Sequence, residues 1–324
     1  MLGGILLPQS PVGDSHVVIV TGIGGQSQYS DAFHRWGVAM FDAAAERLGL
    51  PAENIVLLSE RPERDPERIS ARSTKENVER VLEDLAQRVA HPDRIFILLI
   101  GHGSSDGTES RFNLPGPDMS ATDFAAQLGK FPTQMVALVN ASSASGDFVA
   151  ALSGPNRVLV TATKTGFEQN ESIFGEFFVE AFASEGADTD HDERVSILEA
   201  FNYARHEVSR RYEDSGRLMT EHALLDDNGD GEGTTNPDSS ETDGAVARSL
   251  FLDRIGVVAS GSASGDSLLV ALYAEKRELE TRVAELRNLK DQMEEEVYEA
   301  ELETLLVELA LKNRAIRARE EALR

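Results

Sequence analysis

The sequence predicts an α/β fold in which a mostly parallel sheet is flanked by helices, followed by a C-terminal coiled-coil helix. Two observations support this prediction. Apolar runs of strand length alternate with segments whose apolar residues stand three and four positions apart, and from residue 268 onward Leu residues recur every seven positions. Runs that are apolar throughout are typical of parallel strands covered on both faces.

The predicted strands and helices alternate along the chain. Five runs rich in Val, Ile and Leu have the length of strands: 16–20, 54–59, 94–101, 135–140 and 157–163. Helical spacing marks the segments between and after them: 31–48, 74–89, 120–128, 171–183 and 196–212. Because ligand sites in such sheets form beyond the carboxyl ends of strands, we expect function in the loops after the first, third and fourth strands.

The composition limits the classes of partner. Asp and Glu outnumber Lys and Arg by 56 to 31, so the surface repels nucleic acid and anionic membranes and favours cations or basic peptides. The absence of cysteine excludes thiolate catalysis and disulfides, and it fits an exported as well as a cytoplasmic location. No apolar run approaches the roughly 20 residues of a membrane span. Residues 1–15 are either an ordinary arm or the remainder of a signal peptide.

His102 follows the most apolar run of the chain, in the motif IGHGS. An imidazole titrates near neutrality, so this position suits a general base at the edge of the sheet. Gly101 and Gly103 allow a substrate backbone to approach closely, and the amide of Gly103 is placed to donate to an oxyanion. A histidine that only stabilises a turn is the alternative.

The next strand ends in NASSASG, residues 140–146, which offers hydroxyl groups beside the imidazole. A base and a hydroxyl on neighbouring strand ends are what nucleophilic catalysis requires. Ser142, Ser143 and Ser145 are all candidates for the nucleophile. Alternatively, these small residues only permit a tight turn, with Ser145 or Asp147 capping the following helix.

This arrangement resembles the caspase and legumain clan of cysteine peptidases, in which a strand ending in His-Gly is followed by a strand whose motif ends in Ser-Gly. The runs VVIVTGIGGQSQYSDAF and RVLVTATKTGFEQNES are similar to the first strand and to the fifth strand with its substrate-pocket loop in legumains, so the resemblance extends over about 16–212. It implies a caspase-like fold and a peptidase, hence a hydrolase, with His102 as base. Ser143 takes the position of the nucleophilic cysteine, and the amides of Gly103 and Ser143 are the oxyanion donors.

The chain departs from that family at two points. Ser143 stands where the family has cysteine, and a serine hydroxyl needs its proton removed during attack and usually a third group that orients the base. Asp106, Asp147 and Glu168 are the candidates for that group. The loop after the first strand carries YSDAFHRW in place of the basic and polar cluster of legumains, so specificity for asparagine is not expected.

Three functions therefore remain open at the level of sequence. The first is a peptidase that uses a Ser143–His102 dyad. The second is a pseudoenzyme that binds an extended peptide without cutting it, with valency supplied by the coiled coil. The third is a calcium-stabilised assembly protein whose cleft has no function.

The run DTDHDERVSILE matches the ligand spacing of an EF-hand calcium loop. Three carboxylates at positions one, three and five, a backbone carbonyl at seven and a closing Glu at twelve would form a structural Ca²⁺ site: Asp188, Asp190, Asp192, Arg194 and Glu199. Position six, normally Gly, is Glu193, so the loop must be strained or bend differently. A solvated acidic loop that caps the helix near Ser196 is the alternative.

A second acidic run begins at residue 226. Asp226, Asn228 and Asp230 occupy positions one, three and five, and Gly231 stands at six. Pro237 replaces the closing Glu at twelve. The run is therefore either part of a site that other oxygens complete or an exposed turn.

The C-terminal part follows a Gly/Ser-rich linker at 259–267, which separates it from the α/β domain at 16–258. From 268 to 324 a heptad repeat predicts one continuous coiled-coil helix that pairs with another chain, giving a homo-oligomer. Its seam includes Leu272, Leu279, Leu286 and Met293, and the phase slips once before the sevenfold spacing resumes at Leu302. A single charged helix lying on the domain is the alternative.

Overall fold

The computed structural model describes residues 13–190, 192, 194–237 and 243–253 in the first part of the chain, and residues 272, 275, 276, 279, 282, 283, 286 and 295–323 after it. The chain divides into two units, Met1–Arg254 and Ile255–Arg324. The linker predicted at 259–267 and Glu193 lie outside the described residues. None of the described helices is long and apolar enough to cross a membrane.

A seven-stranded sheet runs through the first unit, in the order β10-β9-β8-β4-β1-β2-β3. Every neighbouring pair is parallel except β10 and β9. The strands are β1 (Ser15–Thr21), β2 (Ile55–Ser59), β3 (Ile69–Arg72), β4 (Arg94–Ile100), β8 (Met135–Asn140), β9 (Arg157–Thr161) and β10 (Leu224–Asp226). The predicted α/β fold with a mostly parallel sheet is confirmed. The two edge strands, β3 and β10, are too short to give a periodic signal and were not predicted.

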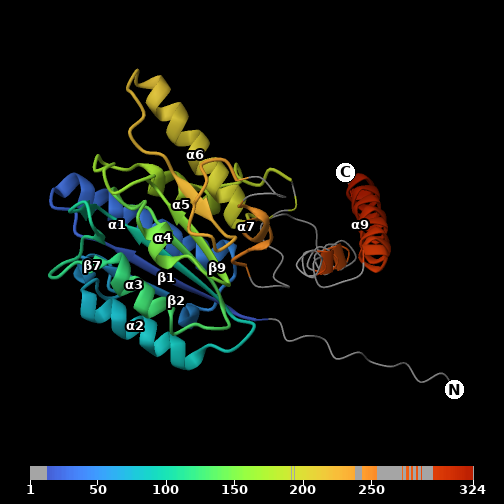
Figure 1. Ribbon diagram of the computed structural model, residues 1–324, viewed down its shortest axis with the longest axis horizontal. Coiled ribbons are helices and arrows are strands. Elements are labelled where there is room, and N and C mark those ends of the chain that lie inside the picture. Colours follow the sequence, from blue (N-terminus) through green and yellow to red (C-terminus); the bar gives the residue numbers. More distant parts are fainter. Residues whose placement is uncertain are drawn as a thin grey trace. The chain divides into compact units, whose positions relative to one another are not determined.

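Helices cover both faces of the sheet (Figure 1). One face carries α1 (Ser27–Asp42), which continues as a π-helical turn (Ala43–Arg47), together with α5 (Phe174–Ala183) and α6 (Ile197–Asp214). The other face carries α2 (Lys75–Arg88), α3 (Ala121–Leu128) and α4 (Phe148–Leu152). Short 3-10 turns (Ala52–Asn54 and Pro62–Arg64) flank β2. Each face buries its own apolar cluster, which explains why the central strands are apolar on both sides.

The strand order places a topological switch point between β1 and β4. From β1 the chain proceeds outward to β2 and β3 on one side, while β4, β8 and β9 extend the sheet on the other. The carboxyl ends of three strands therefore lie side by side, since Thr21 pairs with Ile100 and Leu99 pairs with Asn140. His102 and the NASSASG turn consequently emerge from neighbouring strand ends, as predicted.

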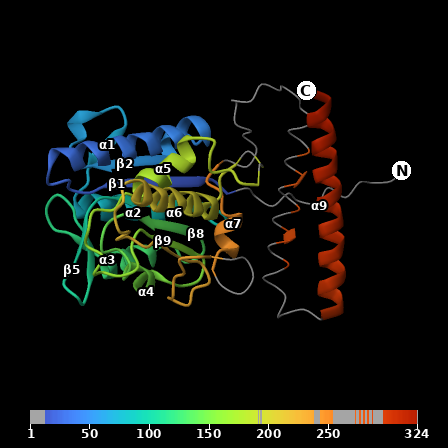
Figure 2. The same cartoon turned by 90° about the horizontal axis from the view of Figure 1, so that it is seen from above.

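A small antiparallel sheet continues from the end of β4. It contains β5 (Gly103–Ser105), β6 (Ser110–Phe112) and β7 (Met119–Ser120). These strands of two or three residues were not predicted, because they are too short to show alternation. Figure 2 shows β5 at the opposite end of the first unit from α7 (Ala245–Ser249). Strands β5 and β6 thus lie next to the carboxyl edge of the main sheet.

A buried carboxylate, Glu221, fixes the start of α5. Its two oxygens accept hydrogen bonds from the Ser172 hydroxyl at 2.7 Å, from the amides of Ile173 and Phe174 at 3.1–3.2 Å, and from the Tyr212 hydroxyl at 3.3 Å. Burial raises the pKa of Glu221 despite these donors. The segment after α6 is thereby tied to the helix that packs against β1 and β4.

The second unit contains α9 (Glu295–Leu323), which packs against the preceding segment of the same chain. Leu279, Val283 and Leu286 form one buried cluster with Leu305, and Lys312 pairs with Glu275. In one continuous helix Leu279 and Leu305 would be about 39 Å apart. The prediction of one uninterrupted helix is therefore wrong, because the apolar repeat folds back on itself within the chain.

Glu221→Ala is expected to lower the free energy of unfolding by about 3 kcal/mol, because four buried donors lose their acceptor. Urea denaturation followed by circular dichroism measures this change. Glu185→Ala is the control, since Glu185 is exposed just beyond α5 and should change stability by less than about 0.5 kcal/mol. Equal effects of the two substitutions would contradict the anchoring role of Glu221.

Candidate active site

His102 lies immediately after β4, at the switch point of the sheet. Its ring meets Tyr29 edge-on at 4.7 Å between ring centroids and Phe33 at 5.1 Å, so α1 forms one wall around the imidazole. The side chain is half-buried. These two aromatic contacts leave the imidazole little room to change its rotamer.

Burial lowers the pKa of His102, and this is the largest of the effects on it. Two weaker effects oppose it: the negative charge of Glu171 and a hydrogen bond to the backbone of Gly24 both raise the pKa of His102. A backbone group that raises the pKa of an imidazole is an acceptor, so the partner is the Gly24 carbonyl oxygen. The neutral imidazole is favoured near pH 7, with one ring N–H directed at Gly24.

Ser143 is 3% exposed, and its hydroxyl is bonded to the residue that follows His102. Ser143 Oγ accepts a hydrogen bond from the Gly103 amide at 3.1 Å and donates to the Gly103 carbonyl at 3.2 Å. The structure thus brings Ser143 against Gly103, the residue next to His102 in the chain. The proton of the hydroxyl, however, points to a backbone carbonyl instead of to the imidazole.

The two neighbouring serines are held in the turn itself. Ser142 Oγ bonds Asn140 Oδ1 at 2.6 Å, and Ser145 Oγ lies 3.1 Å from Thr163 Oγ1, whose oxygen also accepts the amide of Ser145 at 2.7 Å. Ala144 between them has a positive φ of 52°. The alternative nucleophiles Ser142 and Ser145 are therefore buried members of the turn that joins β8 to α4.

Gly103 is required by the close approach of the two strand ends. A Cβ on Gly103 would stand 2.1 Å from the Ser143 carbonyl oxygen and 2.8 Å from Ser142 Oγ. Both of these distances are far below a van der Waals contact, so a side chain here would push β8 away from β5. This packing requirement is the reason that glycine follows His102.

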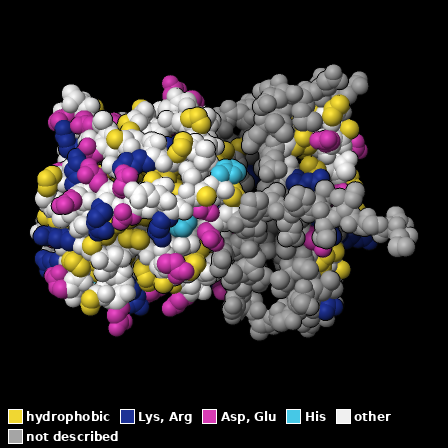
Figure 3. All heavy atoms as spheres, turned by 90° about the horizontal axis from the view of Figure 1, so that it is seen from below, with side chains coloured by type: hydrophobic (Ala, Val, Ile, Leu, Met, Phe, Trp, Pro, Cys, Tyr) yellow, Lys and Arg dark blue, Asp and Glu magenta, His cyan; other side chains and the backbone are white. Residues whose placement is uncertain are grey.

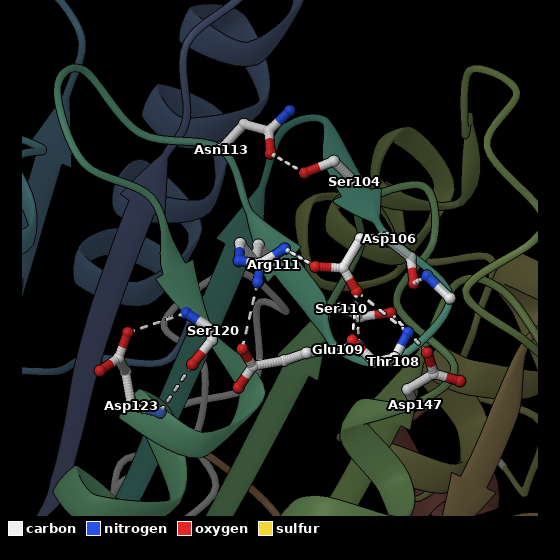
Figure 4. Close-up of polar contacts among 12 residues, drawn as sticks. Ser104, Asp106, Thr108, Glu109, Ser110, Arg111, Asn113, Ser120, Asp123 and Asp147 are labelled. Carbon is white, nitrogen blue, oxygen red and sulfur yellow. Dashed lines mark hydrogen bonds and ion pairs between the residues drawn. The ribbon is translucent and has the colours of Figure 1, made fainter.

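Two of the three carboxylates considered as partners for His102, Asp106 and Asp147, bind other groups (Figure 4). Asp106 bonds Thr108 and pairs with Arg111 at 2.9 Å, and these contacts hold the pKa of Asp106 well below its usual range. Asp147 accepts from Ser110 Oγ at 2.7 Å. The groups that act on His102 are instead the Gly24 backbone, through a hydrogen bond, and Glu171, through its negative charge.

Glu168 forms a second carboxylate–imidazole pair on the same edge of the sheet. Glu168 Oε1 lies 2.6 Å from His222 Nδ1, and Glu168 Oε2 accepts the amides of Lys164 and His222. The Glu168 carbonyl accepts the Ala144 amide at 2.8 Å, so the loop after β9 is tied directly to the turn that holds Ser143. Sequence reasoning missed His222, which lies more than fifty residues further along the chain.

Two apolar side chains are exposed in the loops that border this site. Phe167, in the loop after β9, is 79% exposed, and Ile23, in the loop after β1, is also exposed. Carboxylates accompany them in the same loops, since Glu168 and Glu171 follow Phe167. The edge of the sheet thus combines negative charge with exposed apolar surface.

The predicted metal loop brings its three aspartates together. One carboxylate oxygen from each of Asp188, Asp190 and Asp192 lies within 4.8 Å of the others, which is close enough for one cation to contact all three. Asp192 is buried, and its amide donates to both Asp188 and Asp190 at 3.1 Å. Ca²⁺ would fit this all-oxygen set.

Glu199 and Arg194 have other partners in this structure. Glu199 Oε1 accepts from Thr189 at 3.0 Å, and Glu199 Oε2 accepts from Ser196 at 2.8–2.9 Å in a capping box at the start of α6. The Arg194 guanidinium pairs with Asp253 and stacks 3.6 Å over the Phe251 ring. Closure by Glu199 and ligation by the Arg194 carbonyl stay predictions.

The metal loop lies at the opposite end of the sheet from His102. Phe251 lies next to the loop and forms an antiparallel β-bridge with Ser196. The Arg94 side chain, at the first residue of β4, donates a hydrogen bond to the Phe251 carbonyl at 3.0 Å. Strand β4 therefore separates this loop from the imidazole at its other end. A cation held here would brace the fold without contacting the candidate active site.

Charges of both signs are interspersed over the face of the molecule in Figure 3. Lys and Arg side chains lie among Asp and Glu side chains there. The full chain carries a net charge of −25.

Comparisons with known proteins identify no family. No family model matches the chain, and no curated protein matches it. Among solved structures, protein GSU0716 from Geobacter sulfurreducens has a TM-score of 0.41 and 11% sequence identity, covering 70% of this chain and 95% of its own.

Nuclear magnetic resonance titration of the histidine rings should place the pKa of His102 below its ordinary value of 6.5. Glu171→Gln is expected to lower the pKa of His102 further, because it removes the negative charge that favours the imidazolium. Because the pKa of His102 is lower in the folded chain, the unfolded chain binds the proton more tightly. Protonation of His102 therefore lowers the free energy of unfolding as the pH falls below 6.5.

The matched control is Glu185→Gln, which removes the same charge beyond the far end of α5 and should leave this pKa unchanged. A pKa of His102 above 6.5, or one that rises in Glu171→Gln, would contradict the described environment.

Proposed function

We propose that this protein is a caspase/legumain-like domain that binds an extended peptide at the carboxyl edge of its sheet without hydrolysing it. The observation that carries this proposal is the double hydrogen bond between the Ser143 hydroxyl and the Gly103 backbone. A nucleophilic hydroxyl must give its proton to a base and turn a lone pair toward the substrate. Here the Ser143 hydroxyl donates a hydrogen bond to the Gly103 carbonyl. One of its lone pairs accepts a hydrogen bond from the Gly103 amide.

The loops around this edge favour a ligand that is cationic and partly apolar. Glu168 and Glu171 lie in the loop after β9, where the charge of Glu171 acts on His102, and Asp106 and Asp147 lie by β5 and β6. The exposed ring of Phe167 offers an apolar contact that the folded chain itself does not use. A basic peptide with an aromatic or aliphatic residue complements both features.

Hydrolysis by a Ser143–His102 dyad is the second candidate, and one observation favours it. The Gly24 carbonyl holds one ring N–H of His102, which leaves the other ring nitrogen able to accept a proton. The Gly103 amide, the expected oxyanion donor, is 3.1 Å from Ser143 Oγ. Rotation of the hydroxyl away from Gly103 would then be needed before attack.

Ca²⁺ at Asp188, Asp190 and Asp192 has a structural role in this proposal. The three carboxylates converge at the start of α6, where repulsion between them opposes folding until a cation neutralises it. Because the loop contacts Asp253 and Phe251, the bound cation would also fix the end of the first unit.

Self-association through the C-terminal unit accompanies the binding function. Although α9 packs within its own chain, it exposes Val297, Leu306, Val307 and Leu311. Exposed apolar side chains along one helix are typical of a surface that pairs with another helix, and the heptad spacing makes a second copy of the chain the expected partner. Two or more clefts per assembly would raise the avidity for a repetitive ligand.

Basic decapeptides on an array are expected to bind the full-length protein more strongly than acidic or neutral ones, and binding should weaken as the salt concentration rises. Phe167→Ala should reduce binding of the best peptide by about tenfold in fluorescence anisotropy, the usual scale for loss of an aromatic contact. Leu218→Ala is the control, because Leu218 is 89% exposed and lies outside these loops. Equal losses in both variants would remove the assigned surface.

A fluorophosphonate probe separates the two candidate functions. The binding proposal predicts no labelling of Ser143 between pH 5 and pH 9, a range that spans about two units on either side of neutrality. Labelling that disappears in both Ser143→Ala and His102→Ala would instead establish the hydrolase.

A chain that ends at residue 258 is expected to be monomeric in light scattering, while the full-length chain has a higher mass per particle. Leu306→Glu with Leu311→Glu should produce the same loss in the full chain, because these side chains are exposed and their replacement leaves the internal cluster intact. A monomeric full-length protein would contradict the proposed association.

A further inference from the structure

The second acidic run contains a buried carboxylate oxygen with no hydrogen-bond partner. Asp226 is 1% exposed, and its Oδ2 atom has no partner among the described residues. Its other oxygen, Oδ1, accepts the Gly229 amide at 3.1 Å. Because Oδ1 binds the Gly229 amide, the Asp226 carboxylate lies against the loop that follows β10.

The charge around Asp226 makes this arrangement costly. Asp227 and Asp243 are also buried, and they bind backbone amides: Asp227 accepts from Gly244 and Ala247, and Asp243 accepts from Asp227. In the described part of the chain, none of the three aspartates forms an ion pair with Lys, Arg or His. The backbone amides offset part of this charge, and the remaining repulsion among three neighbouring carboxylates disfavours the folded state.

The loop places further oxygens next to this carboxylate. Asn228 Oδ1 accepts the Asp230 amide at 2.8 Å, and the Asn228 amide group donates to Asp230 Oδ2 at 3.0 Å, so the two side chains lie together. Gly231 has a φ of +79°, which allows the sharp turn that calcium loops make at this position. Positions one, three, five and six thus all have suitable residues.

A second buried oxygen without a partner lies beside the same loop. Ser153 Oγ, at the end of α4, is buried and has no partner among the described residues. A Cβ on Gly231 would be 3.8 Å from the Ser153 Cβ, so the loop packs directly on this residue. Asp226 Oδ2 and Ser153 Oγ are thus two buried oxygens without partners that border the same loop, and such atoms indicate a missing positive or donor group.

We propose that the loop from Asp226 to Glu232 binds a second Ca²⁺ ion. Asp226, Asn228 and Asp230 provide side-chain oxygens, and Glu232 provides its carbonyl oxygen at position seven. Asp243 contributes negative charge nearby. The ion gives the Asp226 Oδ2 atom its partner and offsets the repulsion among the three buried carboxylates.

Calcium fits this site better than the other common cations. All the ligands are oxygen, which disfavours zinc and other metals that prefer nitrogen or sulfur. The set mixes carboxylate, amide and carbonyl oxygens in an irregular loop, whereas Mg²⁺ demands near-octahedral geometry and retains several waters. Pro237 stands at position twelve, where a calcium loop normally has its closing Glu, so water molecules would complete the coordination of the ion.

Calorimetric titration of the EGTA-treated, full-length protein with CaCl₂ tests the proposal. Asp230→Ala should reduce the number of bound Ca²⁺ ions by one relative to the unsubstituted chain, and this change is tolerated because Asp230 is exposed. Asp190→Ala should independently remove the Ca²⁺ ion bound by the loop that holds Asp188, Asp190 and Asp192. Asp214→Asn, an exposed aspartate at the end of α6, is the charge control and should leave the stoichiometry unchanged.

No calcium binding, or a stoichiometry that Asp190→Ala lowers and Asp230→Ala does not, would overturn the proposal. A second variant gives a test by sign. In EGTA, Asp226→Asn should melt at the same temperature as the unsubstituted chain or higher, because it removes a buried charge; in calcium it should melt lower. If Asp226→Asn and the unsubstituted chain differ in melting temperature by the same amount with and without calcium, the proposal is also overturned.

Discussion

The close approach of Gly103 to Ser143 determines the shape of the candidate active site. Parallel pairing of β4 and β8 brings their carboxyl ends together, and only a glycine fits where the two backbones meet. The Ser143 hydroxyl then joins the two ends through both a donated and an accepted hydrogen bond. His102 is placed by the same contact, because it is the residue before Gly103.

The two ends of the sheet carry different chemistry. The carboxyl end carries the His102 imidazole together with the exposed apolar side chains of Ile23 and Phe167, a combination suited to recognising another molecule. Near the amino end of β4, the loop Asp188–Glu199 and the α7 segment are held by ion pairs and backbone amides. Neutralising the carboxylates there would stabilise the frame on which the opposite edge is built, without direct contact between the two.

Sequence reasoning identified the central strands, the helices and the neighbourhood of His102 and Ser143, because these depend on periodicity and strand order. It missed the groups that surround His102. The Gly24 carbonyl has no side chain to signal it, and Glu171 and His222 reach the site from distant parts of the chain. It also misjudged the C-terminal segment, since a heptad seam pairs equally well within a chain as between chains.

The replacement of cysteine by serine has a specific consequence in this setting. A thiolate forms readily beside a histidine, whereas a serine must lose its proton during attack, so the base has to be strong and its protonated form stabilised. Burial lowers the pKa of His102, which makes it a weaker base, and its fixed partner is a neutral carbonyl instead of a carboxylate. Glu171 opposes this effect only in part. The same rigid contacts that hinder proton transfer keep the edge preorganised, which favours a ligand that binds and leaves unchanged.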